Sequence, residues 1–268
     1  PEWHLPWNHR FLSLAMPTFV RRARAIIAVS EFTRQEVVSL LQAPPEKVHA
    51  IHEGVDARFR PVREPERLAE VRERYGIREP YVLFLGAIEP RKNLTLLLRA
   101  FAALLPEPGF RHQLVIAGGK GWLCDDVYAT AAQLGLGDRC IFTGRVADED
   151  LPALYSGADI YAWPERYAGF GLPPLEAMAC GAPVVCSNAT SLPEVVGDAG
   201  LLLPPDDERA WAEALRRLAA DQALRRCLAE KGLERARRFT WEETARKTVQ
   251  VYREVAAGGS GRLTAGRS

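Results

Sequence analysis

The chain has 268 residues, 47% of them hydrophobic, and a formal net charge of +1. This length accommodates one large domain, or one domain plus part of another, and the balanced charge argues against a nucleic-acid partner. No apolar run in the sequence is long enough to span a membrane.

The sequence contains five cysteines, with neither a CxxC pair nor a Cys/His cluster. The odd number argues against a disulfide framework and the spacing argues against a zinc site. We therefore expect reduced, mostly buried thiols in a cytoplasmic protein. Basic residues are concentrated at 21–24 and along 225–238. Solvated helix faces are the favoured explanation, and contact with anionic lipid at the inner face of the membrane is the second.

Eight short runs rich in apolar and β-branched residues predict strands. In chain order they are residues 25–29, 48–51, 81–85, 113–117, 139–143, 159–163, 183–186 and 200–203. The near-continuous apolar run at 81–85 is typical of a parallel strand buried on both faces.

Helical patterns lie between these runs. Leucines at 94, 97, 98 and 104, together with Phe101, form a 3.6-residue stripe that predicts a helix over 93–104. Shorter helices are predicted over 148–155 and 174–180. Ser191 with Glu194, and Thr240 with Glu243, each fit a capping box, in which a hydroxyl and a carboxylate satisfy free amides at a helix start.

Strands that alternate with helices predict an α/β fold with a parallel sheet covered on both faces. A polar stretch with Pro61 and Pro65 indicates a domain boundary near 53–66. The segment before it is too small for a core of its own, so we interpret it as the end of a domain whose beginning is absent. The predicted parts are a domain remnant at 1–60, a complete Rossmann-like domain at 61–239, a terminal helix at 240–256 and a Gly/Ser-rich disordered tail at 257–268.

The most informative stretch is a glycine-bearing turn after the strand that ends at 163. Gly169 and Gly171 let the backbone approach a ligand closely, with Phe170 and Leu172 beside them. Two prolines at 173–174 then open a helix, whose free amides and dipole form an anion site.

Glu176 falls in the first turn of that predicted helix. Its carboxylate can accept two hydrogen bonds side by side, which suits a ribose diol. It can equally well serve only to complement the helix dipole. The local pattern does not decide between these two interpretations.

Arg91 and Lys92 follow the strand at 81–85, after Gly86. In a parallel sheet the turns at the carboxyl ends of the strands line the ligand crevice. Two adjacent cations there could neutralise a diphosphate, with Arg offering a fork and Lys a point charge. Taken alone, the pair is better explained as ordinary surface charge on a loop.

Two further turns carry glycine and a cation. Gly118 and Gly119 follow the strand at 113–117, and Arg145 and Val146 follow the strand at 139–143. Each is weak evidence alone, because glycines are common at such turns for packing reasons. Four such turns in one domain together predict a nucleoside diphosphate laid across the top of the sheet.

Several of these segments resemble the retaining glycosyltransferase family 4, also called the group 1 glycosyltransferases, over nearly the whole chain. AVSEFT at 28–33 and EGVD at 53–56 resemble two segments near the end of the family's first domain, with Glu53 in place of the usual Asn. The loop PRKN at 90–93 matches the family's phosphate-binding loop. The segments at 191–194, 198–200 and 239–241 match later stretches in the same order. The last of them opens the terminal helix, which in this family crosses back to the first domain.

The resemblance implies the two-domain GT-B architecture, with most of the first domain lacking, and Arg91 and Lys92 as catalytic residues. The family carries two glutamates with seven residues between them; Glu176 matches the second, and Ala168 stands at the first. Glu165, three residues earlier, is a weaker candidate for the first. The donor-binding residues predicted in this way are Gly86, Gly118, Gly119, Arg145, Val146, Gly169, Phe170, Gly171, Leu172 and Glu176.

The resemblance also implies a reaction. A hexose would pass from a GDP- or UDP-linked sugar to a glycan or lipid-linked acceptor, with the anomeric configuration retained. Charge would build on the departing diphosphate, so donors preorganised there should matter most. Neither a cofactor nor a divalent metal is expected, and the sequence has no convincing DxD cluster. Resemblance to bacterial polysaccharide enzymes suggests mannose as the sugar.

Three other interpretations stay open. A donor-binding half alone would bind nucleotide sugar and transfer nothing. A dinucleotide oxidoreductase would need a GxGxxG turn, which neither 86–89 nor 118–121 provides. A sugar epimerase on the same fold would share the nucleotide binding but not the loop of Arg91 and Lys92.

Overall fold

The computed structural model describes residues 6–260 and divides into two compact units. Unit 1 comprises Pro1–Gly54 and Phe239–Ser268, and unit 2 comprises Val55–Arg238. The boundary after Gly54 lies within the predicted boundary region at 53–66, six residues before the end of the predicted remnant at 60. The terminal helix groups with the N-terminal segment in unit 1, in agreement with the crossover that the resemblance implies.

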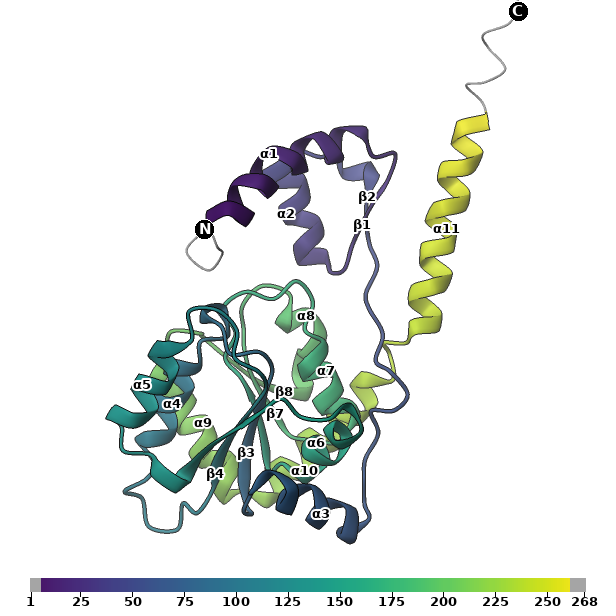
Figure 1. Ribbon diagram of the computed structural model, residues 1–268. Helices are drawn as coiled ribbons and strands as arrows, with labels where there is room; N and C mark the ends of the chain where they lie inside the picture. The colour runs from purple at the N-terminus through teal and green to yellow at the C-terminus, as the bar shows by residue number, and fades with distance from the viewer. Residues whose placement is uncertain (1–5, 261–268) are drawn as a thin grey trace, which may run out of the picture. The chain divides into compact units, whose positions relative to one another are not determined.

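Unit 2 is built on a fully parallel sheet with the strand order β5-β4-β3-β6-β7-β8 (Figure 1). The strands are β3 (Tyr81–Leu85), β4 (Gln113–Ala117), β5 (Cys140–Gly144), β6 (Ile160–Trp163), β7 (Val184–Ser187) and β8 (Gly200–Leu203). The first four side chains of β3 are completely buried, as expected for a central strand covered on both faces. All six strands predicted here are confirmed to within one residue at each end.

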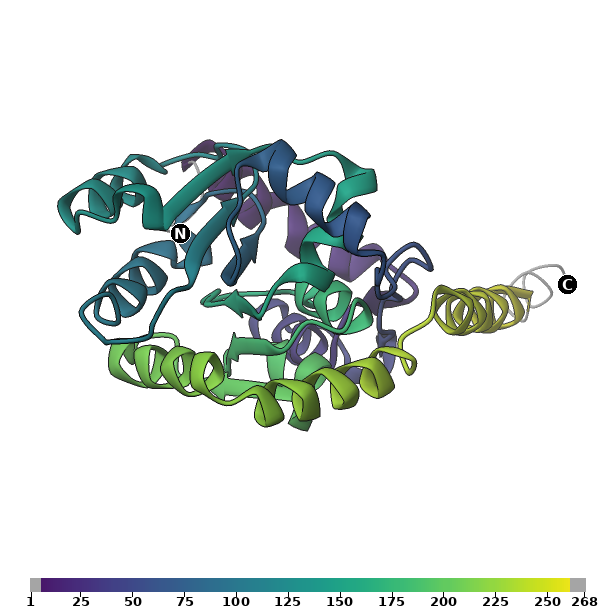
Figure 2. The same cartoon turned by 90° about the horizontal axis from the view of Figure 1, so that it is seen from below.

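Helices lie on both sides of this sheet (Figures 1 and 2). The predicted leucine stripe is confirmed for Leu94, Leu97, Leu98 and Phe101, which are all buried on α4. The helix ends at Ala102, so the predicted end at 104 is wrong by two residues, and the buried Leu104 lies beyond it. On one side are α4 (Leu94–Ala102), α5 (Asp125–Gln133) and α9 (Glu208–Ala220). On the other are α3 (Pro65–Tyr75), α6 (Leu151–Gly157), α7 (Leu172–Ala179) and α10 (Gln222–Ala236). Shorter helical segments are η2 (Pro90–Lys92), η3 (Gly137–Arg139), η4 (Asp148–Asp150), α8 (Leu192–Val196) and η5 (Gly197–Ala199).

The strand order fixes where a ligand crevice belongs. From β3 the chain winds outward through β4 to β5, then crosses back to place β6 on the other side of β3. The two turns that leave β3 and β6 therefore diverge to opposite faces of the sheet. In doubly wound sheets this switch point, at the carboxyl ends of the strands, is where ligands bind.

Unit 1 contains the parallel pair β1 (Ile26–Ala28) and β2 (Val48–Ala50). Its helical segments are α1 (Pro6–Arg22), α2 (Glu31–Leu41), η1 (Pro45–Lys47) and α11 (Trp241–Ser260). Its small core is formed by Val20, Ala28, Ala43 and Val48. None of the described helices is both long and apolar enough to cross a membrane.

The start of α11 shows the hydroxyl half of the predicted capping box, while the carboxylate of Glu243 pairs with Arg246 and Lys247. The hydroxyl of Thr240 accepts a hydrogen bond from the amide of Glu243 at 3.2 Å. Gly54 packs so tightly here that a Cβ would collide with the backbone of Trp241. The helix continues to Ser260, so the predicted end at 256 is wrong by about one turn. The last part of the predicted tail, 261–268, lies outside the described residues.

Candidate functional site

The turns after β3 and β6 lie next to each other because β3 and β6 pair directly, with Val82 opposite Ile160. The turn after β3 forms η2 and carries Arg91 and Lys92. The turn after β6 carries Glu165 and leads into α7. A backbone hydrogen bond of 2.9 Å from the amide of Arg166 to the carbonyl of Arg91 joins the two turns.

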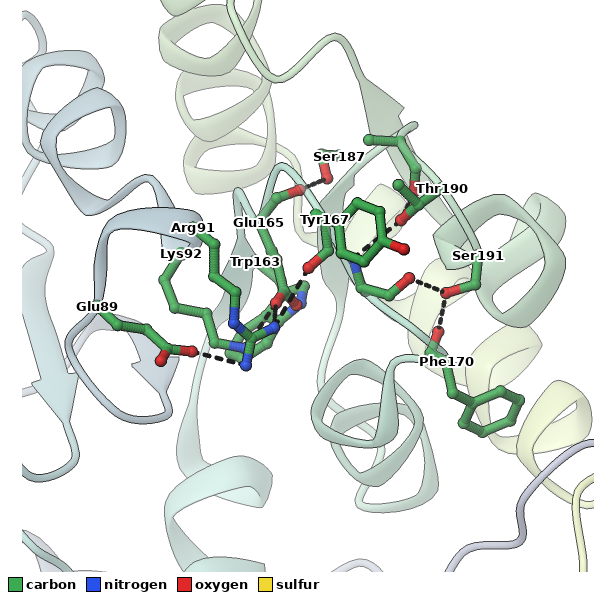
Figure 3. A network of polar contacts seen from close by, with 12 residues as sticks. Glu89, Arg91, Lys92, Trp163, Glu165, Tyr167, Phe170, Ser187, Thr190 and Ser191 are labelled. Atoms are coloured by element: carbon green, nitrogen blue, oxygen red, sulfur yellow. Dashed lines mark hydrogen bonds and ion pairs between the residues drawn. The ribbon is translucent and has the colours of Figure 1, made fainter. Parts of the chain in front are cut away.

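Glu165 is the centre of a buried polar cluster at this point (Figure 3). Its side chain is 2% exposed. One carboxylate oxygen accepts hydrogen bonds from Arg91 and from Nζ of Lys92, the latter at 2.8 Å. The other accepts from Nε1 of Trp163 at 2.8 Å. The interpretation of Arg91 and Lys92 as ordinary surface charge is therefore wrong.

Arg91 is the more accessible of the two cations. Its guanidinium also pairs with the carboxylate of Glu89 at 2.6 Å and donates to the carbonyl of Tyr167 at 3.2 Å. Its side chain stays 31% exposed, against 9% for Lys92. Two cations and two carboxylates thus form one compact cluster, and Arg91 is the member that solvent reaches best.

Burial dominates the ionisation of the cluster's centre. It raises the pKa of Glu165, although Lys92, Arg91 and Trp163 all act in the opposite direction. Burial likewise lowers the pKa of Lys92, and the carboxylate of Glu165 opposes that change. Each charge of this pair is therefore kept in place chiefly by the other.

Close packing explains why two of the predicted donor-binding residues, Gly86 and Gly118, are glycines. Nζ of Lys92 lies 4.2 Å from the ring centre of Trp163, which stacks on Phe84. A Cβ on Gly86 would approach that indole to 3.0 Å, and one on Gly118 would collide with the carbonyl of Gly86. Gly119, by contrast, faces open space within 4 Å. Of the three, only Gly119 leaves room beside its backbone.

Arg145 and Val146 are not brought together with the cluster. They follow β5, which is separated from β3 by β4, so they lie about 10 Å away across the sheet. Arg145 is exposed, whereas Val146 is buried against the domain. Their assignment as donor-binding residues stays a prediction.

The glycine turn at 167–171 is fixed from the side by the segment that follows β7. The hydroxyl of Ser191 lies 2.9 Å from the carbonyl oxygen of Ala168 and 2.7 Å from that of Phe170. The hydroxyl of Thr190 accepts from the amide of Ala168 at 3.0 Å. Ser191 does not cap α8, so the capping box predicted there is wrong: this tertiary contact uses its hydroxyl instead.

The start of α7 offers fewer amides than the prediction assumed. Positions 173 and 174 are prolines, and the amide of Leu175 already bonds to the carbonyl of Gly171. Among the described residues, the amides of Gly171 and Leu172 have no hydrogen-bond partner. Gly171 adopts a φ of 122°, which only glycine tolerates readily. Any anion held by this helix start would rest on these two donors.

Glu176 lies farther along α7 than predicted. The helix begins at Leu172, two residues before the predicted start at 174, and no acidic residue falls in its first turn. The interpretation of Glu176 as a complement to the helix dipole thereby loses its basis. The carboxylate accepts a hydrogen bond from the buried hydroxyl of Tyr155 at 2.9 Å. Burial raises its pKa, and the bond from Tyr155 opposes this.

Metal-ligating clusters are not found in the described part of the chain, where no group of three or more His, Cys, Asp or Glu side chains converges. Asp125 and Asp126 lie in the first turn of α5. The thiols are buried, except that of Cys227. The pairing of Glu165 with Arg91 and Lys92 was not predicted; the signal in the sequence is a charged residue two positions after a buried strand, at the same sheet edge as Arg91.

Comparison with known proteins gives two family matches. Residues 69–235 match the family described as glycosyl transferases group 1, and residues 1–59 match the one described as glycosyltransferase family 4. The O-antigen chain mannosyltransferase B of Escherichia coli is 37% identical over 255 residues, which cover 94% of this chain and 66% of that protein.

Solved structures agree with the family matches. Sucrose-phosphate synthase from Thermosynechococcus elongatus superposes with a TM-score of 0.79 at 31% identity, over 91% of this chain and 61% of that one. HepE of Anabaena, solved with UDP and glucose, superposes with a TM-score of 0.77 over 93% of this chain and 66% of that one; its 23% identity shows the fold alone. The chain therefore spans slightly less than two thirds of these relatives, and its fold is of the GT-B type. Since the first family match covers most of its residues, the chain belongs to the group 1 glycosyl transferases.

Proposed function

We propose that unit 2 binds a nucleoside diphosphate sugar at the carboxyl edge of β3 and β6. The observation that carries this proposal is the pair Arg91 and Lys92, held by Glu165 at the topological switch point of the sheet. Arg91 retains an exposed face, so a diphosphate can reach its guanidinium without unfolding the turn. The free amides of Gly171 and Leu172 would add donors from the neighbouring turn.

The proposed activity is transfer of a hexose, with retention, to a glycan or lipid-linked acceptor in polysaccharide or glycolipid synthesis. The relative from Escherichia coli is named as an O-antigen mannosyltransferase, which favours mannose as the sugar. The HepE structure with UDP and glucose supports a nucleotide-linked donor. We assign Glu176 to the ribose, where its carboxylate would accept from the two hydroxyls.

Arg91 and Lys92 would stabilise the negative charge that develops on the departing diphosphate. Cations that are already fixed in place need no rearrangement during reaction, and Lys92, which is 9% exposed, would act in a less polar medium than water. The proposal therefore assigns the role of a divalent metal to these two side chains. The acceptor would have to enter from the open side of the same edge.

The test is the melting temperature of the chain with UDP, GDP, ADP and their sugars, with and without magnesium. A ligand at 100 times its Kd should stabilise the protein by about 2.7 kcal/mol. We expect a metal-independent shift with one base, which Glu176→Ala abolishes. Glu230→Ala is the matched control, because Glu230 is an exposed helical glutamate on α10.

The outcomes separate three cases. A shift in the parent and in Glu230→Ala, but not in Glu176→Ala, supports the donor site and identifies the nucleotide. A shift without sugar transfer favours a chain that binds the donor but does not transfer on its own. No shift with any nucleotide in a folded protein refutes the donor site.

A further inference from the structure

The turn after β6 carries a carboxylate in an unusual place. Ala168, which stands where the family has its first glutamate, is buried, and its amide and carbonyl are both occupied by the segment after β7. No carboxylate can act from that position. The acid that this turn does carry is Glu165, immediately beyond β6.

Glu165 is anchored through both its main chain and its side chain. Its carbonyl accepts a hydrogen bond from the buried hydroxyl of Ser187 at the end of β7. Its carboxylate accepts from the indole of Trp163, a side chain buried within β6. Two neighbouring strands therefore determine where the carboxylate lies, before any contact with the cations is counted.

The same carboxylate cannot serve as a ligand for substrate. Its two oxygens already accept from three donors, and its side chain is 2% exposed. The cations, in contrast, depend on it. Among the described residues, Nζ of Lys92 has no hydrogen-bond acceptor other than Glu165. Arg91 is held from both sides, by Glu165 and by Glu89.

We infer that Glu165 is a positioning residue for the donor diphosphate: it holds Arg91 and Lys92 side by side in the orientation in which they neutralise the phosphates. This inference rests on the proposed donor site. Glu165 lies three residues before Ala168, the position of the family's first glutamate. It thus affects diphosphate binding through Arg91 and Lys92 and does not touch the donor itself.

Two effects of removing this charge oppose each other. Loss of one negative charge beside the phosphates would by itself strengthen their binding. Loss of the anchor would leave Arg91 held only by Glu89 and the carbonyl of Tyr167, and would leave Lys92 buried without its counter-charge, which weakens phosphate binding. The inference requires the second effect to be larger, since ordered cations and not net charge are what Glu165 supplies.

The pKa of Lys92 provides a second test of the positioning role of Glu165. Burial already lowers the pKa of Lys92, and Glu165 is the main opposing group. Without the carboxylate that pKa falls further, so Lys92 loses its proton at a lower pH. Affinity for a diphosphate, which needs charged Lys92, should then decline with rising pH earlier than in the parent.

The experiment is calorimetric titration of the full chain with UDP and GDP across a pH series. The parent is compared with Glu165→Gln, which removes the charge, and Glu165→Asp, which keeps the charge but shortens the side chain. Glu230→Gln is the control for a change of charge elsewhere in unit 2, and melting temperatures verify folding. We expect Glu165→Gln to bind about tenfold more weakly or worse, with the alkaline decline moved to lower pH. Glu165→Asp should also bind more weakly, but with the decline unmoved.

The outcomes are distinguishable. If the parent binds neither nucleotide, the proposed donor site fails, and the positioning role fails with it. If the parent binds and Glu165→Gln binds equally or more tightly, the donor site stands and the positioning role is overturned. If Glu165→Gln does not fold, Glu165→Asp decides, because affinity equal to that of the parent would show that the placement of the carboxylate is immaterial.

Discussion

Unit 2 contains two buried carboxylates, Glu165 and Asp150, that each accept hydrogen bonds from two cationic side chains and one aromatic side chain. Their pKa values are nevertheless shifted in opposite directions. Glu165 accepts from Arg91, Lys92 and the indole of Trp163. In the second case, Asp150 in η4 accepts from two arginines and a tyrosine hydroxyl: Arg67 at 2.5 Å, Arg74 at 2.8 Å and Tyr75 at 2.7 Å.

The two sites differ in where their cations lie. The three donors to Asp150 come from α3, and both of its arginines remain substantially exposed. Burial would raise the pKa of Asp150, but the bonds from Tyr75, Arg74 and Arg67 together outweigh it and lower that pKa. For Glu165 burial prevails and the pKa is raised.

The comparison shows that pairing chemistry alone does not distinguish a functional site from a structural clamp. Asp150 attaches α3 to the start of α6, in the loop that follows β5, and β5 is two strands away from β3 in the sheet. Glu165 lies at the switch point and keeps a cation buried there. The raised pKa of Glu165 and the burial of Lys92 beside it are therefore the features that distinguish the proposed site from the Asp150 cluster.

The largest expected effect is on sugar transfer, and it should appear in the Glu165 cluster but not in the Asp150 cluster. Lys92→Met should lower kcat/KM for sugar transfer by on the order of a hundredfold to a thousandfold, because one fixed cation at the departing diphosphate is lost. Arg74→Met, the matched change at Asp150, should leave kcat/KM unaltered. Transfer rates with a nucleoside diphosphate sugar, measured on folded protein, provide the check. Equal losses in both variants would contradict the distinction.

The sequence predicted the framework of the site well. Each strand of unit 2 was located to within one residue. Short, near-continuous apolar runs bounded by Gly and polar turns are typical of parallel strands that are buried on both faces. The turn of Arg91 and Lys92 was found for the same reason, since a charged turn after a buried strand must lie at the sheet edge.

The pairing within the site could not be predicted. Lys92 and Glu165 are 73 residues apart, and they meet only because the chain crosses from β5 to place β6 beside β3. Ser191 fits a local capping box, yet its hydroxyl bonds to the turn before α7. The unusual φ of Gly171 lets α7 begin early, which moved Glu176 into the second turn. In each case a tertiary contact or a glycine conformation overrides the local pattern.

His112 extends the comparison to a buried titratable group whose side chain has no hydrogen-bond partner in the described structure. His112 is 5% exposed, stacks on Phe110, and neither ring nitrogen has a hydrogen-bond partner in the described structure. Burial, with smaller contributions from Arg225 and Arg139, lowers its pKa to about 4. The unfolded chain, with a pKa of 6.5, therefore takes up this proton first as the pH falls.

The consequence is a stability loss on acidification. The contribution of neutral His112 is fully present above pH 6.5 and is lost as the pH falls toward 4. The loss should reach roughly 3 kcal/mol. Urea unfolding of the parent and of His112→Phe at several pH values measures it, since only the parent carries this titration. Parallel curves for the two proteins over that range would rule out a buried neutral imidazole.

The smallest expected effect tests whether Asp150 contributes only to stability and not to nucleotide binding. Asp150→Asn keeps the shape of the side chain but removes the charge that Arg67, Arg74 and Tyr75 share. Because both arginines reach water, the loss should be smaller than for a fully buried pair, about 2 kcal/mol at neutral pH. It should appear as a lower urea midpoint with an unchanged m value, and nucleotide affinity should not change.

The stabilisation by Asp150 should depend on pH, with a direction set by its lowered pKa. The folded pKa of Asp150 is lowered, so its stabilisation is present above the reference value of 3.8 and disappears as the pH falls through the folded pKa. The parent and Asp150→Asn should therefore converge in stability only in strong acid. Glu149→Gln, a change at the exposed neighbouring residue, should follow the parent throughout. A nucleotide affinity that fell in Asp150→Asn would instead place this cluster in the donor site and remove the contrast with Glu165.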